Sequence, residues 1–333
     1  MIRLLLLVPL FFSLTVAQAA EERWPIGKVD LPADPVAMEQ TEQGPRLELA
    51  DGTFWLIGWE GGKPALAASL PPKRATEPNM LPDGRVASGN GAIRRAWLSD
   101  PTTEYGHAIL GDGIEAKSLT VETANGQRLT YTAPGGTVFE DLYPRLWDLD
   151  ADGEAEAWVI RAGPDGGGRL EAYGVHDGKL IRRFATDPIG HGYRWLNPIG
   201  VADFTGNGQR EVVLMRTPHI GGIMMFYSAA GAHLEPFMAA PGLSNHAIGS
   251  RQLRLQWVAD IDGDGLADIL IPGQPRREMI AFSMVGGKFS VIGTTERTGH
   301  IETDFAGMTL SDGGRIVLFG DDSPALRWLR LPD

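Results

Sequence analysis

Alternating apolar and polar stretches predict a chain of short β-strands. Between Glu154 and Thr186, the apolar-rich runs "EAEAWVIRAG", "GRLEAYGV" and "KLIRRFAT" are separated by the turn-rich stretches "PDGGG" and "HDGK". Short runs bounded by Gly, Pro and Asp are typical of antiparallel strands joined by hairpins. No stretch of the chain predicts a convincing helix, so we expect an all-β fold.

The same arrangement recurs along the chain. Aligning on a glycine brings together "LWDLDADGEAEAWVI" (146–160), "VADFTGNGQREVVLM" (201–215) and "VADIDGDGLADILIP" (258–272), whose first acids lie 55 and 57 residues apart. Strand candidates follow each copy, as in "GGIMMFYSAAGA" and "KFSVIGTTE". A period of this size with several strands per unit is typical of propeller blades.

Weaker copies flank these three and bring the count of units to six. They start near the mature N-terminus, at His107, and near the C-terminus. We therefore predict a β-propeller of four-stranded antiparallel blades, six in number, with seven as the alternative because residues 71–94 could hold a degenerate unit. A strand after Trp24 could complete the last blade and remove exposed sheet edges.

The N-terminal residues predict a secretory signal. Arg3 precedes the apolar run 4–16, and Ala17-Gln18-Ala19 matches the small-residue pattern of a cleavage site near Ala19. We expect residues 1–19 to be a signal peptide and 20–333 to form one domain, secreted or periplasmic. No other stretch is long and apolar enough for a membrane span.

Net charge and the absence of cysteine restrict the classes of partner and the sources of stability. The formal net charge of -12 disfavours nucleic acid and anionic membranes and suits divalent cations. The chain has no cysteine, so it forms no disulfides and must gain its stability from core packing, ring closure or metal. We expect a monomer.

The acidic repeats predict metal loops. In D-x-D-x-D-G, a tight loop brings the side chains at positions one, three and five together, position seven offers a backbone carbonyl, and a carboxylate at position nine completes the shell. The three sets are Asp148, Asp150, Asp152, Glu154 and Glu156; Asp203, Thr205, Asn207, Gln209 and Glu211; and Asp260, Asp262, Asp264, Leu266 and Asp268. Such oxygen ligands favour calcium, with two strong sites and a weaker middle site that has only two acids.

The acidic loops allow two other interpretations. An EF-hand needs a glutamate at position twelve, where this chain has Val159, Leu214 and Ile271, so these loops precede buried strands. Alternatively, the aspartates only cap local backbone amides. Because acidic or amide residues recur at positions one, five and nine in each of the three loops, we favour metal binding over capping.

The run "VADxDGDGxxDI", from Val258 to Ile269, strongly resembles the VCBS or FG-GAP-like repeats of exported bacterial proteins and of integrin α-subunit propellers. The resemblance covers residues 140–295 well and the flanks poorly. It implies a β-propeller with calcium in the blade loops, at the ligand positions just named. Thr205 and Asn207 depart from the pattern. Because the family includes adhesins and ligand-binding modules, it leaves the molecular task open.

A second repeated pattern precedes the acids. Arg194 and Arg251 each lie nine residues before a first acid, and each follows a histidine. If these segments enter innermost strands, they would ring the mouth of the channel and could bind an anionic or polyhydroxylated ligand, with Trp97, Trp195 and Trp257 as stacking faces. The candidate ligand residues are His191, Arg194, His246, Arg251, Arg94 and Trp195. Alternatively, the arginines pair with nearby acids and the tryptophans pack in the core.

These observations predict a non-catalytic binding or adhesion module whose partner is a glycan or a protein. The alternative is a secreted or periplasmic enzyme that acts on a saccharide or a similar small molecule at the channel mouth. The chain shows no G-x-S-x-G elbow and no cysteine nucleophile, and no catalytic residue can be named.

Overall fold

The computed structural model describes residues 23–285 and 288–332, so the predicted signal at 1–19 lies outside the described residues. The described chain contains strands, turns and loops but no helix, which confirms the all-β prediction. It follows that no described segment offers a helix with the length and apolar character to cross a membrane.

The described strands form four hydrogen-bonded sheets of 13, 5, 4 and 4 strands, and within these sheets nearly all strands fall into six groups of four antiparallel neighbours. Group 1 holds β3 (Pro35–Thr41), β4 (Gly44–Leu49), β5 (Phe54–Glu60) and β6 (Lys63–Ser69). Group 2 holds β7 (Ala87–Ser88), β8 (Ile93–Thr102), β9 (Glu115–Thr123) and β10 (Arg128–Thr132). Group 3 holds β12 (Arg145–Trp147), β13 (Glu156–Ala162), β14 (Arg169–His176) and β15 (Lys179–Ala185). The short β11 (Val138–Phe139) pairs with both β9 and β13.

Groups 4 to 6 repeat the scheme. Group 4 holds β16 (Leu196–Ala202), β17 (Glu211–Arg216), β18 (Ile223–Ala230) and β19 (His233–Pro241). Group 5 holds β20 (Trp257–Ala259), β21 (Asp268–Pro272), β22 (Met279–Val285) and β23 (Lys288–Thr295), with β1 (Arg23–Trp24) added in parallel. Group 6 holds β24 (Ala306–Thr309), β25 (Arg315–Gly320) and β26 (Ala325–Arg330), and β2 (Gly27–Asp30) from the N-terminal side supplies its fourth strand.

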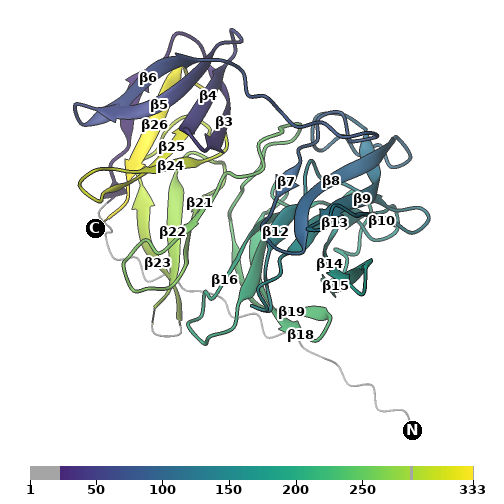
Figure 1. Cartoon of the computed structure of the whole chain (residues 1–333). Helices are drawn as coiled ribbons and strands as arrows, with labels where there is room; N and C mark the ends of the chain where they lie inside the picture. The colour runs from purple at the N-terminus through teal and green to yellow at the C-terminus, as the bar shows by residue number, and fades with distance from the viewer. Residues whose placement is uncertain (1–22, 286–287, 333) are drawn as a thin grey trace.

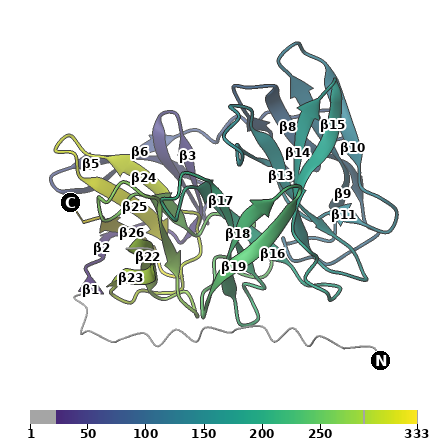
Figure 2. The ribbon, with the colours of Figure 1, turned by 90° about the horizontal axis from the view of Figure 1, so that it is seen from below.

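Four antiparallel strands in chain order are the content of a propeller blade. Figures 1 and 2 show groups 1 and 6 on one side, group 4 in the middle and groups 2 and 3 on the other side. The second strands β13 and β21 are buried along their whole length, whereas the fourth strand β19 is mostly exposed. Strands buried on both faces read as continuous apolar runs, which explains "AWVI" (157–160) and "ILIP" (269–272).

The hydrophobic core lies between neighbouring groups. Val213 and Met215 of group 4 pack with Ile269 and Ile271 of group 5. Similar clusters join group 5 to group 6 and group 6 to group 1, while groups 2, 3 and 4 share a larger cluster. Stacked sheets that bury apolar faces against each other account for these clusters without any disulfide.

Antiparallel order divides the loops between two ends of each group. Loops that join the first and second strands emerge at one end, and this end carries the acidic repeats. Loops that join the second and third strands emerge at the other end, together with the connections between groups. We call these the acidic end and the connecting end.

Candidate functional site

The first acidic loop gathers three carboxylates between β12 and β13. Asp148, Asp150 and Glu156 each offer an oxygen within 4.8 Å of the others. Glu156 begins β13, and its side chain is buried, with Oε2 accepting a hydrogen bond from the Leu149 backbone N–H at 3.3 Å. The β-strand therefore fixes one ligand position while the loop supplies the other two.

The loop between β20 and β21 repeats this arrangement with Asp260, Asp262 and Asp268, again within 4.8 Å. Asp268 begins β21 and is 0% exposed. Its Oδ2 accepts hydrogen bonds from the backbone N–H groups of Ile261 at 2.6 Å and Asp262 at 3.2 Å. Glu156 and Asp268 occupy the same position in the aligned repeats, and in the structure each is the first residue of the second strand of its group.

Each loop leaves a buried oxygen without a partner. Asp148 Oδ1 and Asp268 Oδ1 accept no hydrogen bond from any described residue. Burial raises the pKa of Asp268 and raises that of Glu156 to about 7. Enclosed carboxylate oxygens are costly unless something neutralises them, and a hard cation at the centre would do so. The donor set is all oxygen, so it fits calcium.

Arginines hold both loops, and two of the three come from a neighbouring group. Arg210 of group 4 donates to the Asp148 carbonyl and contacts its Oδ2 at 3.1 Å, while Arg183 pairs with Asp150 at 2.8 Å. Arg315 of group 6 donates to the carbonyls of Asp260 and Ile261. The first loop is thus partly neutralised already. The second loop keeps its three carboxylates free of ion pairs with described residues, so it is the stronger candidate.

Three other predicted ligand residues, Asp152, Asp264 and Glu154, accept hydrogen bonds from backbone N–H groups. The side chains of Asp152 and Asp264 accept from the backbone N–H groups of Glu154 and Leu266, and neither joins the three-carboxylate group. The Glu154 side chain reaches group 2, where it accepts from the Ala92 backbone N–H.

The middle loop is closed by its own hydrogen bonds. Asp203 accepts from three backbone N–H groups, and Glu211 accepts from the Thr205 hydroxyl at 2.6 Å and the Asn207 amide at 3.5 Å. Asn207 Oδ1 in turn accepts from the Gln209 backbone N–H at 2.7 Å. This loop therefore has fewer free oxygens for a cation than the other two.

The connecting end carries a cavity of about 130 Å³. Its walls come from the β8–β9 loop, the connection before β16, the β17–β18 loop and the connection before β20. The lining residues are His107, Ile109, Tyr193, Arg194, Trp195, Thr217, His219, Ile220 and Ile248. Tyr193, Ile220 and Ile248 are large apolar side chains that stay exposed at 50%, 62% and 70%. Exposed apolar groups around a concave site are typical of ligand-binding surfaces.

A chain of hydrogen bonds sets the tautomers of two histidines. His246 Nε2 lies 2.9 Å from the Ser250 carbonyl, and His246 Nδ1 lies 2.8 Å from His219 Nε2. A carbonyl only accepts, so His246 carries its hydrogen on Nε2 and accepts from His219. Burial lowers the pKa of His219 to about 4 and of His246 to about 3, so both rings are neutral at pH 7.

His107 is held by a buried acid. Its Nδ1 lies 2.5 Å from Glu140 Oε1, and burial raises the pKa of Glu140 to about 7 against the opposing effect of this hydrogen bond. The stacked pair Tyr105 and Tyr193, with ring centroids 5.0 Å apart, packs beside the imidazole. With Nδ1 turned to Glu140, Nε2 is the nitrogen that His107 can offer to a ligand.

The structure brings together three of the six predicted ligand residues. Arg194 and Trp195 line the cavity, and His246 lies behind it, with its ring 4.7 Å from that of Trp195. Arg251 instead pairs with Asp83 and Asp112, at 2.8 and 2.7 Å. Arg251 thus follows the alternative interpretation, in which the arginines satisfy nearby acids.

The other two predicted ligand residues lie elsewhere. His191 is exposed in the same connection, but it is not among the residues that line the cavity. Arg94 is at the start of β8, where it donates to the Asn90 carbonyl at the acidic end. The repeated spacing along the chain therefore does not bring all of the predicted ligand residues together around one site.

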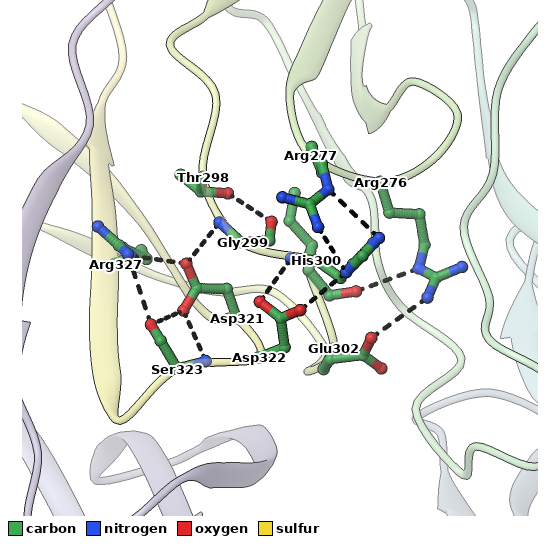
Figure 3. A network of polar contacts seen from close by, with 11 residues as sticks. Arg276, Arg277, Thr298, Gly299, His300, Glu302, Asp321, Asp322, Ser323 and Arg327 are labelled. Atoms are coloured by element: carbon green, nitrogen blue, oxygen red, sulfur yellow. Dashed lines mark hydrogen bonds and ion pairs between the residues drawn. The ribbon is translucent and has the colours of Figure 1, made fainter.

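A separate polar network at the connecting end joins groups 5 and 6 (Figure 3). His300 lies between Arg277 and Asp322, with Nδ1 at 2.8 Å from Asp322 Oδ2, while Asp321 accepts from Arg327 at 2.8 Å. Each charged group drawn there contacts another member of the network. We interpret it as a structural brace between the two groups.

Comparisons with known proteins give only distant likenesses. No family model matches the chain, and no curated protein matches it. Similar solved structures include the WD40 domain of a coronin from Toxoplasma gondii, with 10% identity, 96% of this chain and 89% of that chain covered, and a TM-score of 0.44. An exotype rhamnogalacturonan lyase has 14% identity, with 90% of this chain and 64% of that chain covered and a TM-score of 0.43. A glucose dehydrogenase has 13% identity, with 92% of this chain and 99% of that chain covered and a TM-score of 0.42. The fold and the site therefore rest on this chain's own strands and side chains.

Sequence reasoning missed four residues of the cavity region: His107, Glu140, Tyr193 and His219. They come from segments more than 100 residues apart at the extremes and match no catalytic or metal motif. One local signal was available, because Tyr193 is next to Arg194 in the repeated pattern that the sequence singled out.

Proposed function

We propose that the protein is an exported, calcium-binding β-propeller that acts as a binding module without catalytic activity. The observation that carries the proposal is the convergence of three carboxylates in each of two equivalent loops, each with a buried oxygen that lacks a partner. Recurrence at equivalent places argues for a repeated structural ion, because a catalytic pair would be expected once.

The six groups of strands support a six-bladed propeller as the form of the molecule. β2 pairs with β26, so the chain's N-terminal side completes the last group. The resemblance of the acidic loops to VCBS or FG-GAP-like repeats supports the same interpretation. We place the protein in the periplasm or outside the cell, on the basis of the signal expected at 1–19.

The partner would be a glycan or another exported protein, held at the connecting end. The cavity there combines exposed apolar side chains with the guanidinium of Arg194. Calcium would act from the acidic end by ordering the loops. At a free concentration of about ten times its Kd, each ion would add about 1.4 kcal/mol to the free energy of unfolding.

The test is a calorimetric calcium titration of the EDTA-treated protein. We expect two sites, and we expect Asp262→Ala to lose one of them, because Asp262 is exposed and belongs to the second three-carboxylate group. A matched control is Asp312→Ala, which changes an exposed acid in the corresponding loop of group 6, outside both carboxylate groups. Absence of calcium binding, or equal losses in both variants, would contradict the proposal.

A second candidate function is an enzyme acting at the cavity, favoured by the His107–Glu140 pair. A buried carboxylate that orients an imidazole is the arrangement of a general base and its partner. Incubation with oligosaccharides distinguishes the candidates. Release of smaller products that His107→Gln abolishes would establish the enzyme, whereas intact oligosaccharides agree with a binding module.

A further inference from the structure

The cavity at the connecting end is lined by a positively charged side chain, Arg194, that has no acidic partner among the described residues. Arg194 is exposed, its Nη1 donates only to the neighbouring Tyr193 carbonyl at 3.3 Å, and it forms no ion pair with any described residue. By contrast, Arg251 nearby is neutralised by two aspartates. In a protein of net charge -12, an arginine left free at a concave site favours an anionic ligand, and its planar fork suits a carboxylate.

The histidine tautomers add a second requirement. His219 gives its Nε2 hydrogen to His246, so Nδ1 is left as an acceptor at the cavity wall. When Glu140 is ionised, His107 gives its Nδ1 hydrogen to that carboxylate and leaves Nε2 as a second acceptor. Two acceptors in one small cavity need a ligand that brings hydrogen-bond donors, and hydroxyl groups supply them.

An aromatic face completes the site. One face of the Tyr193 ring stacks on Tyr105, with an interplanar angle of 8°, and half of the Tyr193 side chain remains exposed. Ile220 and Ile248 extend this apolar surface at the rim. A flat ring can pack its C–H face on such a surface while its edge groups reach the polar wall.

We propose that this cavity binds the pyranose ring of a sugar acid. Arg194 holds the carboxylate, His219 and His107 accept from ring hydroxyls, and Tyr193 packs on the ring face. The inference rests on the proposed binding function and names its ligand class. At about 130 Å³ the cavity is smaller than the roughly 300–1,000 Å³ of drug-sized sites, so it takes one ring, either free or at the end of a chain.

The experiment is a ligand-observed NMR titration of the calcium-loaded protein with sodium D-glucuronate and, separately, with D-glucose. The two probes share the ring and differ in the carboxylate. We expect saturable glucuronate binding and at least about tenfold weaker glucose binding, because the charge-assisted contact with Arg194 is missing. We expect Arg194→Gln to weaken glucuronate binding about tenfold and to leave glucose binding unchanged.

Two further variants keep the result interpretable. Arg94→Gln removes an exposed arginine at the acidic end and should bind glucuronate as the unaltered protein does. Ile248→Trp fills the rim from an exposed position, so it should weaken both ligands while the protein remains folded. Glucuronate binding that survives Arg194→Gln and Ile248→Trp would overturn the inference, as would no saturable binding by the folded protein.

A calcium titration of the same sample separates this inference from the function it rests on. Two calcium sites without glucuronate binding would overturn only the ligand assignment. Glucuronate binding without calcium sites would support the ligand assignment and overturn the calcium part of the proposed function. New resonances from a transformed ligand would overturn the non-catalytic role.

Discussion

The carboxyl group of Glu140 is buried among three other titratable groups. His107 hydrogen-bonds to it, while Glu115 and Asp141 repel its ionised form. Burial is the largest effect and raises its pKa from 4.5 to about 7. The native protein therefore keeps this proton over a pH range in which the unfolded chain has released it. The contribution of Glu140 to the free energy of unfolding therefore falls as pH rises from about 4.5 to about 7 and then levels off.

Glu140→Gln should remove that pH dependence. Glutamine keeps the shape of the side chain but does not ionise, so the variant should gain stability relative to the unaltered protein as pH rises from about 5 to about 8. The shift in the free energy of unfolding is at most about 3 kcal/mol, from linkage. Urea denaturation at both pH values in calcium measures it. Glu60→Gln, at an exposed hairpin, is the control, and equal pH profiles for all three proteins would contradict the prediction.

At the scale of elements, the acidic loops and the strands after them were predictable from local sequence. Glu156, Glu211 and Asp268 begin β13, β17 and β21, as the aligned repeats require. The cavity was not predictable in the same way. Tyr193 and His219 line it from separate loops, and Glu140 acts on it through His107. Their proximity depends on how the groups pack, which spacing along the chain does not encode.

Two tryptophans show the same limit. The sequence suggested Trp97 and Trp257 as stacking faces for a ligand. In the structure Trp97 is buried beneath Arg95 and Arg128, and the Trp257 ring covers Gly307 of the neighbouring group. Aromatic residues in such a fold fill space between sheets as readily as they bind ligands.

The contact between β20 and β24 predicts a requirement for glycine. A Cβ at Gly307 would overlap the Trp257 ring, and this glycine needs no unusual backbone conformation. We expect Gly307→Ala to destabilise the protein by about 1–3 kcal/mol, because the indole must move out of a packed interface. Thermal unfolding measures the loss. Gly135→Ala is the control, since a Cβ there meets no atom within 4 Å. Equal unfolding midpoints for the two variants would contradict this packing.

At the scale of the whole molecule, the two ends of the chain depend on each other. β2 pairs with β26 over four residues, from Gly27 with Trp328 to Asp30 with Ala325, and Trp24 and Ile26 pack against the core shared by groups 5 and 6. The last group is thus completed by residues that precede group 1 in the chain. This pairing covers the edge of β26 and makes the stability of group 6 depend on β2.

Removing the N-terminal strand tests this dependence. A chain that begins at Leu31 lacks β1 and β2, so it loses six ladder pairs, two with β23 and four with β26, together with the burial of Trp24 and Ile26, and β26 becomes an exposed edge. We expect its unfolding midpoint to fall by several degrees and its exposed edge to promote self-association, both measured against a chain that begins at Ala20. A synthetic peptide of residues 20–31, added in excess, should raise the midpoint again by occupying the vacant edge. The prediction is contradicted if the shortened chain unfolds at the same temperature, stays monomeric and shows no change in midpoint when the peptide is added. In that case β2 does not contribute to stability, and group 6 is stable with three strands.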